Sequence, residues 1–231
     1  MTSKPSLEQI QALKNYTACD ISDGLLKLKV PNCGFLPDLT LITPSTTPSD
    51  SQIIIAPAST VLFAPKNAPD LSSYPPKNVP AGKHYVDLTE PETIVVLSQP
   101  KGQICAVLGG IMALRMQMRS AQGVVVHGRV RDIAELRESG LPIWARGTSI
   151  TGTGAEAAPH ALQVPLDLDG TLVRPGDLVF CDAANGVVVI PQDKVSELLS
   201  MLPGLVEADD RVKEDVRKGM TVQEAFKKHR G

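Results

Sequence analysis

An arginine and two carboxylates lie close together in the second half of the chain, as Arg131, Asp132 and Glu135. Arginine keeps its charge and offers a planar fork of donors, so Arg131 can hold an oxyanion while charge develops on it. Asp132 can bind Mg²⁺ or Mn²⁺ directly, and Glu135, one helical turn later, can hold a metal-bound water. This set of catalytic candidates suits a divalent metal ion and a small keto acid.

The surrounding pattern predicts the elements that would position these residues. An apolar run at 103–108 is interrupted by Gly109-Gly110, and 111–121 has apolar residues at helical spacing. The β-branched run at 124–126 is typical of a strand buried on both faces. Together these segments predict a βαβ unit with parallel strands. The Gly109-Gly110 turn and the Arg131-Asp132 turn would then both follow the carboxyl ends of strands. This is the edge where open α/β sheets bind ligands.

The predicted helix start is a second binding element. Its first N–H groups, at Gly110, Ile111 and Met112, would be free to bind a carboxylate or phosphate, and the helix dipole would reinforce them. Glycine also lets a ligand approach the backbone closely. The sequence therefore predicts an anion site beside the arginine and the carboxylates.

The same residues also fit interpretations without a site. Gly109-Gly110 fits a simple tight turn, and Arg131 fits a solvated loop cation. Asp132 with Glu135 matches a helix N-cap and its capping-box partner. Spacing alone leaves both interpretations open.

Four stretches of the chain resemble the RraA-like family, namely 17–25, 56–65, 109–136 and 175–191. The third, GGIMALRMQMRSAQGVVVHGRVRDIAEL, closely resembles that family's 4-hydroxy-4-methyl-2-oxoglutarate (HMG) and 4-carboxy-4-hydroxy-2-oxoadipate (CHA) aldolases. The resemblance implies an α/β fold of the swivelling-domain type. That fold is a layered α/β/β/α sandwich whose mixed sheet contains the central βαβ unit and C-terminal antiparallel hairpins. We expect a single domain over 1–231, with helical segments at about 5–28 and 193–229.

The resemblance also implies a class II pyruvate aldolase that requires Mg²⁺ or Mn²⁺. The family's metal aspartate falls on Asp132 and its substrate arginine on Arg131. The substrate-binding backbone segment falls on Gly109, Gly110, Ile111 and Met112. Glu207, in the predicted C-terminal helix, matches a glutamate that a neighbouring subunit contributes to the site. The implied assembly is a homotrimer or a dimer of trimers.

This chain departs from the bacterial form of the family pattern at Gly110. Bacterial members typically have an aspartate there that helps to hold the metal's waters. A second form, of fungal and plant relatives, has glycine there and an acid three positions after the Arg-Asp pair, as Glu135 is here. The chain resembles this second form.

The implied substrate is HMG or CHA, cleaved to pyruvate and a second keto acid, which is pyruvate or oxaloacetate. Oxaloacetate decarboxylation would pass through the same pyruvate enolate. A metal-linked water is the predicted base; His127 is an alternative, although a lone histidine at a strand end is more often structural. The competing function is that of a regulatory branch of the family, which binds and inhibits a ribonuclease. Asp132, which that branch lacks, favours the enzyme.

Composition fits a compact enzyme of 231 residues with a substantial core. A net charge of -2 gives no electrostatic case for nucleic acid or a membrane surface. No apolar run approaches the roughly 20 residues of a spanning helix, and the N-terminus lacks the apolar core of a signal peptide. Four scattered cysteines without metal-type spacing indicate reduced thiols and a cytoplasmic protein.

The remaining segments predict framework and connections. Residues 162–190 predict two antiparallel hairpins, and 193–202 and 205–218 predict two helices. The glycine-rich stretch 147–155 lacks the GK[ST] ending of a phosphate loop and predicts a flexible loop. A long surface connection is predicted at 65–82. Just beyond it, His84 has no partner at a recognisable spacing.

Overall fold

The computed structural model describes residues 5–43 and 53–230. The strands are β1 (Phe35–Leu36), β2 (Thr40–Thr43), β3 (Ile53–Pro65), β4 (Ile94–Ser98), β5 (Ala106–Leu108), β6 (Gly123–Val130), β7 (Ile143–Thr148), β8 (Ala157–Leu162), β9 (Leu166–Leu168), β10 (Thr171–Val173), β11 (Leu178–Asp182) and β12 (Gly186–Ile190). The α-helices are α1 (Leu7–Leu13), α2 (Ala18–Lys27), α3 (Gly110–Met118), α4 (Ile133–Glu138), α5 (Val195–Arg217) and α6 (Val222–His229). Four 3₁₀ turns are η1 (Pro31–Gly34), η2 (Tyr85–Leu88), η3 (Thr153–Ala155) and η4 (Gln192–Lys194).

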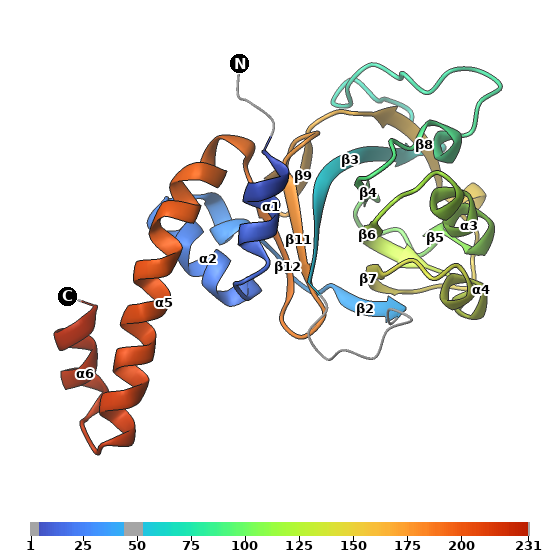
Figure 1. The fold of residues 1–231 in the computed structure, drawn as a ribbon. Helices are drawn as coiled ribbons and strands as arrows, with labels where there is room; N and C mark the ends of the chain where they lie inside the picture. The colour runs from blue at the N-terminus through green and yellow to red at the C-terminus, as the bar shows by residue number, and fades with distance from the viewer. Residues whose placement is uncertain (1–4, 44–52, 231) are drawn as a thin grey trace.

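A mixed ten-stranded sheet organises the chain, with the order β1-β12-β11-β3-β4-β6-β7-β2. Strand β5 pairs with β6, β8 pairs with β3, and β9 and β10 form a separate hairpin. Figure 1 shows α1, α2 and α5 on one side of this sheet and α3 and α4 on the other. The predicted α/β class, with a mixed sheet and helices on both outer faces, is confirmed.

The centre of the sheet is parallel, with β3, β4, β6 and β7 as successive neighbours. Val96 of β4 pairs with Val125 of β6, and both are fully buried. Parallel strands covered on both faces need apolar residues at every position, which explains the uninterrupted valine run. The predicted doubly buried strand is confirmed.

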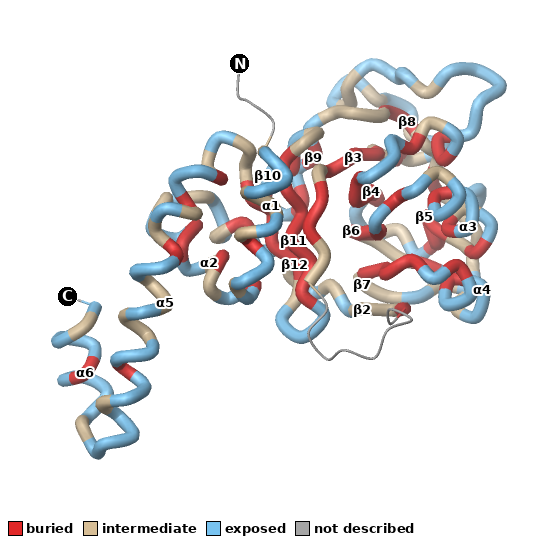
Figure 2. Tube along the Cα trace, in the orientation of Figure 1, coloured by how far each residue is buried: buried red, intermediate tan, exposed pale blue. Residues whose placement is uncertain are grey.

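Three buried clusters correspond to the contacts between the layers (Figure 2). Val124 and Val126 face the cluster under α3 and α4, whereas Val125 between them faces an inner cluster around Trp144. In β11, Phe180 faces a third cluster under α1, α2 and α5, and its neighbours face the inner cluster. Side chains of a strand alternate between its faces, so each central strand serves two cores. The sheet therefore forms both middle layers of the sandwich.

The predicted βαβ unit is β5, α3 and β6. Its strands are parallel, and Leu108 pairs with Val130 at their carboxyl ends. The Arg131 N–H extends this pairing by donating to the Leu108 carbonyl at 3.0 Å. The residues that follow the two strands therefore start side by side.

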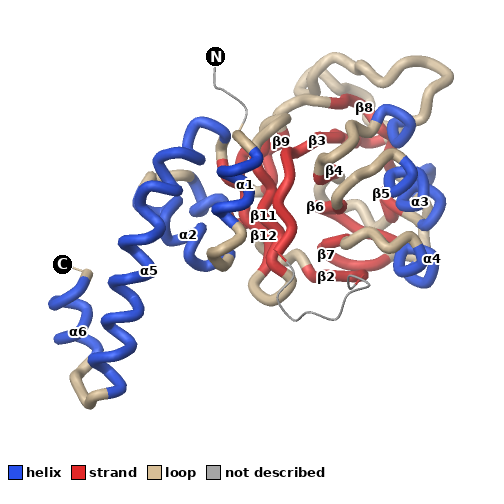
Figure 3. The backbone as a smooth tube through the Cα atoms, in the orientation of Figure 1, coloured by secondary structure: helices blue, strands red, loops and turns tan. Residues whose placement is uncertain are grey.

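The C-terminal part contains the predicted hairpins and one correction. Strands β9 and β10, and β11 and β12, pair antiparallel. The two helices predicted at 193–202 and 205–218 are a single helix, α5, which continues through Pro203 (Figure 3). Proline removes one helical hydrogen bond, but Leu198 and Leu202 are fully buried against the third cluster, and this packing outweighs the loss. No helix within 5–43 and 53–230 is both long and apolar enough to cross a bilayer.

Candidate active site

Three loops converge where parallel strands end. Gly109 follows β5, Arg131 and Asp132 follow β6, and Gly152 lies in the loop after β7. The Asp132 Oδ2 atom lies 3.4 Å from both the Gly110 N–H nitrogen and Arg131 Nε. The structure thus brings together the two turns that the sequence predicted at one sheet edge, as expected for the carboxyl ends of neighbouring strands.

Asp132 adopts an unusual backbone conformation, with φ 59° and ψ 49°. It occupies the N-cap position of α4, but its side chain makes no capping hydrogen bond. The capping-box interpretation of Asp132 and Glu135 is therefore wrong, because a left-handed N-cap points its carboxylate away from the first helical N–H groups. Non-glycine residues in this region carry strain that is commonly found at functional sites. The carboxylate is turned towards Gly110 and Arg131 instead.

Close packing favours glycine at three positions in two of these loops, 109 and 110 after β5 and 152 after β7. A side-chain carbon at Gly109 would lie 2.7 Å from Asp132 Oδ2, and one at Gly110 would lie 2.0 Å from Glu135 Oε2. A side-chain carbon at Gly152 would lie 2.9 Å from Arg131 Nη1. A tight turn alone does not explain these glycines, since each one leaves room for a charged side chain. The two carboxylates therefore lie beside consecutive glycines.

The amides at the start of α3 are less free than predicted. The Met112 N–H donates to the Gly109 carbonyl at 3.1 Å, and the Gly110 N–H points to Asp132. Only the Ile111 N–H of these three has no hydrogen-bond acceptor among the described residues. The tightened first turn therefore leaves one amide, with the helix dipole, for an anion.

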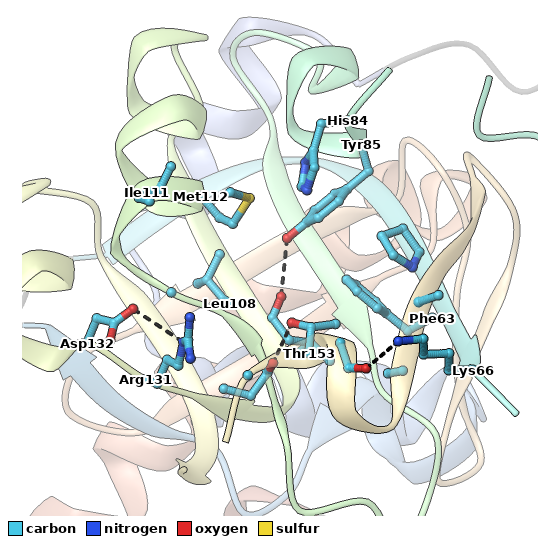
Figure 4. Close-up of a pocket in the computed structure, with 18 residues that line it drawn as sticks. Phe63, Lys66, His84, Tyr85, Leu108, Ile111, Met112, Arg131, Asp132 and Thr153 are labelled. Carbon is cyan, nitrogen blue, oxygen red and sulfur yellow. Dashed lines mark hydrogen bonds and ion pairs between the residues drawn. The ribbon is translucent and has the colours of Figure 1, made fainter. Parts of the chain in front are cut away.

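These groups open into a pocket of about 460 Å³ (Figure 4). Its volume is typical of sites that bind small molecules, which span roughly 300–1,000 Å³. The lining residues are Phe63, Lys66, His84, Tyr85, Ala106, Val107, Leu108, Gly109, Ile111, Met112, Arg131, Asp132, Gly152, Thr153, Gly154, Ala157, Ala158 and Pro159. Most predicted site residues line it. The exceptions are Gly110 and Glu135, which pack against each other behind Asp132, and Glu207.

The donor set permits a metal ion with few protein ligands. Within the part of the chain that the structure describes, no three His, Cys, Asp or Glu side chains gather as a metal cluster. Asp132, which lines the pocket, is available as one direct ligand, whereas Glu135 packs against Gly110 outside the lining. Mg²⁺ commonly keeps several waters and uses one or two carboxylates, so a single aspartate is compatible with this ion.

Glu207 lies away from this pocket. It is an exposed residue of α5 and pairs with Arg211 on the same helix, with Oε1 and Nη2 2.5 Å apart. Figure 1 shows α5 across the sheet from α3. Within one chain Glu207 therefore does not complete the site.

Several pocket residues were not among the predicted site residues. Lys66 directly follows β3, His84 precedes η2, and Thr153 lies in the stretch 147–155, for which a flexible loop is predicted. That stretch is tied down, because Thr153 Oγ1 donates to the Ala106 carbonyl at 2.6 Å and the Ala106 N–H donates to Thr151 at 2.8 Å. Its glycines could have served as the signal, but they lack a recognised motif.

His127 belongs to a different cluster. It is buried, and its Nε2 lies 3.3 Å from Asp169 Oδ2, beside Arg146. Burial, followed by the Arg146 charge, lowers the pKa of the imidazole below its ordinary value, while Asp169 opposes that change. His127 does not line the pocket that holds Arg131 and Asp132, so the structure gives it no contact with that site.

Two known proteins match most of this chain in sequence. Protein DlpA of Legionella pneumophila is 29% identical over 217 residues, which cover 94% of this chain and 33% of DlpA. The chain therefore spans about a third of the length of that relative. A Halalkalibacterium halodurans protein named "Putative 4-hydroxy-4-methyl-2-oxoglutarate aldolase" is 29% identical over 181 residues, 78% of this chain and 79% of that protein.

A solved structure shares the fold. Streptomyces coelicolor RraAS2, described as an unusual member of the RNase ES inhibitor RraA protein family, superposes with a TM-score of 0.69 at 24% identity. The match covers 95% of this chain and 99% of RraAS2. The model of the family described as RraA-like, Aldolase/RraA, matches residues 18–189, well over half of the sequence. The chain therefore belongs to the RraA-like family.

Proposed function

We propose that this protein is a divalent-metal-dependent class II pyruvate aldolase. It would cleave HMG or CHA to pyruvate and a second keto acid, with Mg²⁺ or Mn²⁺ as cofactor. The observation that carries the proposal is Asp132, whose carboxylate is held in a strained backbone conformation, makes no cap, and lines a ligand-sized pocket next to Arg131. The name of the Halalkalibacterium relative supports the same activity.

The chain's own residues divide the work of binding a 2-keto acid. The free Ile111 N–H and the dipole of α3 suit the substrate's carboxylate. The Arg131 guanidinium, whose side chain is 43% exposed, suits the ketone oxygen as it gains negative charge. Asp132 and Glu135 would hold the metal, directly and through water respectively. When bound, a divalent ion polarises the ketone and stabilises the developing enolate.

One site of this kind supports two reactions. In HMG, a base takes the proton of the C4 hydroxyl, the C4 oxygen becomes the ketone of the departing pyruvate, and the C3–C4 bond breaks. Its electron pair stays on the other product as pyruvate enolate, which then takes up a proton. Decarboxylation of oxaloacetate breaks a bond to CO₂ and leaves the same enolate. Arg131 would stabilise the negative oxygen in both cases. We therefore expect oxaloacetate decarboxylase side activity.

We infer that the site follows the second, fungal and plant form of the family pattern. Glu135 packs where a side chain at position 110 would lie, with its own Cβ 2.4 Å from that point. An aspartate at 110 and the present position of Glu135 therefore exclude each other. Gly110 and Glu135 therefore form one paired choice of residues.

We also propose that copies of the chain assemble as a homotrimer or a dimer of trimers. Helix α3 carries exposed apolar side chains at one-turn spacing, with Ile111 72%, Leu114 55% and Met118 67% exposed. A second copy would cover this face. Assembly would also be the route by which Glu207 approaches a neighbouring pocket. Light scattering on the purified protein tests the assembly directly, and a monomer at micromolar concentration would contradict it.

The activity is tested by pyruvate release from HMG, CHA and oxaloacetate with Mg²⁺, in the presence and absence of EDTA. We expect release that EDTA abolishes and that added Mg²⁺ or Mn²⁺ restores. If no substrate yields pyruvate with either metal, the aldolase proposal fails. A regulator that binds a ribonuclease, the class that the RraAS2 description suggests, would then be the function to test.

A further inference from the structure

The pocket carries a cationic side chain at each end. Figure 4 shows Arg131 beside Asp132 at one end and Lys66 beside Phe63 at the other. Arg131 has a carboxylate next to it, with Nε 3.4 Å from Asp132 Oδ2. Lys66 has no carboxylate within ion-pair distance among the described residues. The Lys66 end therefore carries an uncompensated positive charge.

Lys66 is held in position but keeps unused hydrogen-bonding capacity. It follows the last residue of β3, and its Nζ donates to the Gly154 carbonyl at 2.7 Å. This bond links the end of β3 to η3, which leads into β8, the strand paired with this end of β3. An ammonium has three N–H donors and no acceptor, so one bond to Gly154 leaves two donors. The geometry provides an oriented cation that can still bind an anion.

Among the other polar side chains of the lining, Tyr85 and Thr153 are satisfied within the chain, whereas the His84 side chain has no hydrogen-bond partner among the described residues. Tyr85 donates its hydroxyl to the Val107 carbonyl at 3.2 Å, and Thr153 donates to Ala106 at 2.6 Å. Leu108, Met112 and Phe63 supply apolar surface. A ligand that spans this pocket therefore meets a largely apolar lining, with the His84 imidazole as its one unsatisfied polar side chain, between two charged ends. A lining of this kind, with a cation at each end, favours a ligand that has a carbon chain and an anionic group at each end.

We propose that Lys66 binds the second carboxylate of a 2-keto dicarboxylic acid, and that the pocket thereby prefers keto diacids to keto monoacids. The inference rests on the proposed function for the orientation of the ligand, with its 2-keto acid group at Arg131. A monocarboxylate such as pyruvate would leave Lys66 without a counter-ion. The second carboxylate of HMG stays on the departing keto acid, so its binding at Lys66 does not oppose the cleavage.

The test compares two ligands that differ only at the far end. 2-Oxoglutarate and 2-oxovalerate have five carbons and the same keto acid group, but only 2-oxoglutarate has a second carboxylate. We measure both dissociation constants by calorimetry on the full chain with Mg²⁺. The wild-type protein should bind 2-oxoglutarate about 2- to 5-fold more tightly, as expected for an ion pair with an exposed lysine. In Lys66→Met, the two ligands should bind equally, with 2-oxovalerate binding unchanged.

Two further variants separate charge from support of the loop. Lys66→Gln keeps a donor for Gly154 but removes the charge, so most of the preference should disappear while 2-oxovalerate still binds. Lys77→Met, an exposed lysine outside the pocket lining, should keep the full preference. A wild-type protein without preference, or a Lys66→Met variant that retains it, would overturn the inference. Equal loss of both ligands in Met and Gln variants would also overturn it, since Lys66 would then only support η3.

Failure of the proposed function gives a different result. If the wild-type protein shows the Lys66-dependent preference but releases no pyruvate from HMG, the aldolase proposal fails and the diacid site stands. If pyruvate is released without any preference, the aldolase proposal stands and the role of Lys66 is refuted.

Discussion

Asp132 and Asp169 are similar in type and backbone conformation but differ in what surrounds them. Both are aspartates with positive φ, 59° and 56°, in turns that follow strands. Asp169 is held by Lys101 at 2.7 Å and Arg146 at 2.5 Å, with His127 at 3.3 Å. Asp132 has one guanidinium and one amide, each at 3.4 Å.

This difference separates a structural carboxylate from one available to a ligand. Hydrogen bonds from Lys101 and then Arg146 hold the pKa of the Asp169 carboxyl well below its usual range. Its acceptor capacity is used within the chain, where it joins the β9–β10 turn to β7. Asp132 keeps most of its acceptor capacity and lines the pocket of about 460 Å³. Both residues have a strained left-handed backbone, so this conformation does not separate their roles. The hydrogen bonds and ion pairs that each carboxylate makes within the chain do separate them.

The largest effect on activity should come from removing the charge of Asp132. We expect Asp132→Asn to lower metal-dependent pyruvate release by more than about 100-fold, because even outer partners of metal ligands contribute about 10- to 100-fold. Its melting temperature should change little, since the side chain makes only weak contacts within the chain. Steady-state kinetics and thermal unfolding measure the two effects.

Asp169→Asn is the matched control and should show the reverse pattern. Loss of partly exposed ion pairs costs about 1 kcal/mol, which lowers the melting temperature of a chain of this size by about 2–4 °C. Pyruvate release should stay within about twofold of wild type, because Asp169 lies outside the pocket. If Asp169→Asn abolished activity and Asp132→Asn did not, the assignment of the site would be wrong.

A smaller effect should follow from exchanging the paired residues behind Asp132. Gly110→Asp alone should reduce activity by about 10-fold or more, because its side chain would meet Glu135 Oε2 2.0 Å away and displace the loop. Combining it with Glu135→Ala removes the obstacle and supplies a carboxylate from the other loop. We expect the double variant to recover much of the activity.

Kinetics on the two single variants and the double variant give the coupling between the positions. Additive losses would show that Gly110 and Glu135 act independently, contrary to the steric argument. The same experiment asks whether the two forms of the family pattern are alternatives at one place.

The sequence predicted the part of the site that local patterns determine. Gly109 and Arg131 each follow an apolar strand pattern, and the pairing of β5 with β6 brings them together. Lys66 and Thr153 were missed because their positions depend on contacts between distant segments. Lys66 reaches the pocket through the unusual length of β3, which continues beyond β4 to pair with β8. Pro203 was misjudged for a related reason, since tertiary packing outweighed a local helix breaker.

The spacing of residues also could not predict the backbone conformation of Asp132. An aspartate three residues before a glutamate predicts a capping box, and only the observed left-handed backbone excludes it. The fold class was easier to predict, because continuous valine runs and glycine-marked hairpins are signals carried by single segments.

The smallest predicted effect concerns His127 and the pH dependence of stability. Its folded-state pKa is lowered by burial and by Arg146, so the unfolded chain binds the proton more readily. Stability should therefore be complete above the ordinary histidine pKa of about 6.5 and decline as the pH falls below it. The His127→Gln variant lacks this titrating group, so the melting temperature of the variant should fall less than that of the wild type between about pH 7 and pH 5.

Pyruvate release by the His127→Gln variant at neutral pH should be retained, since the cluster around Asp169 lies outside the pocket. An unchanged pH slope would show that His127 does not couple protonation to folding. A large loss of activity at neutral pH would instead mean that the Asp169 cluster supports catalysis as well as the fold, and the distinction between the two aspartates would then be one of degree.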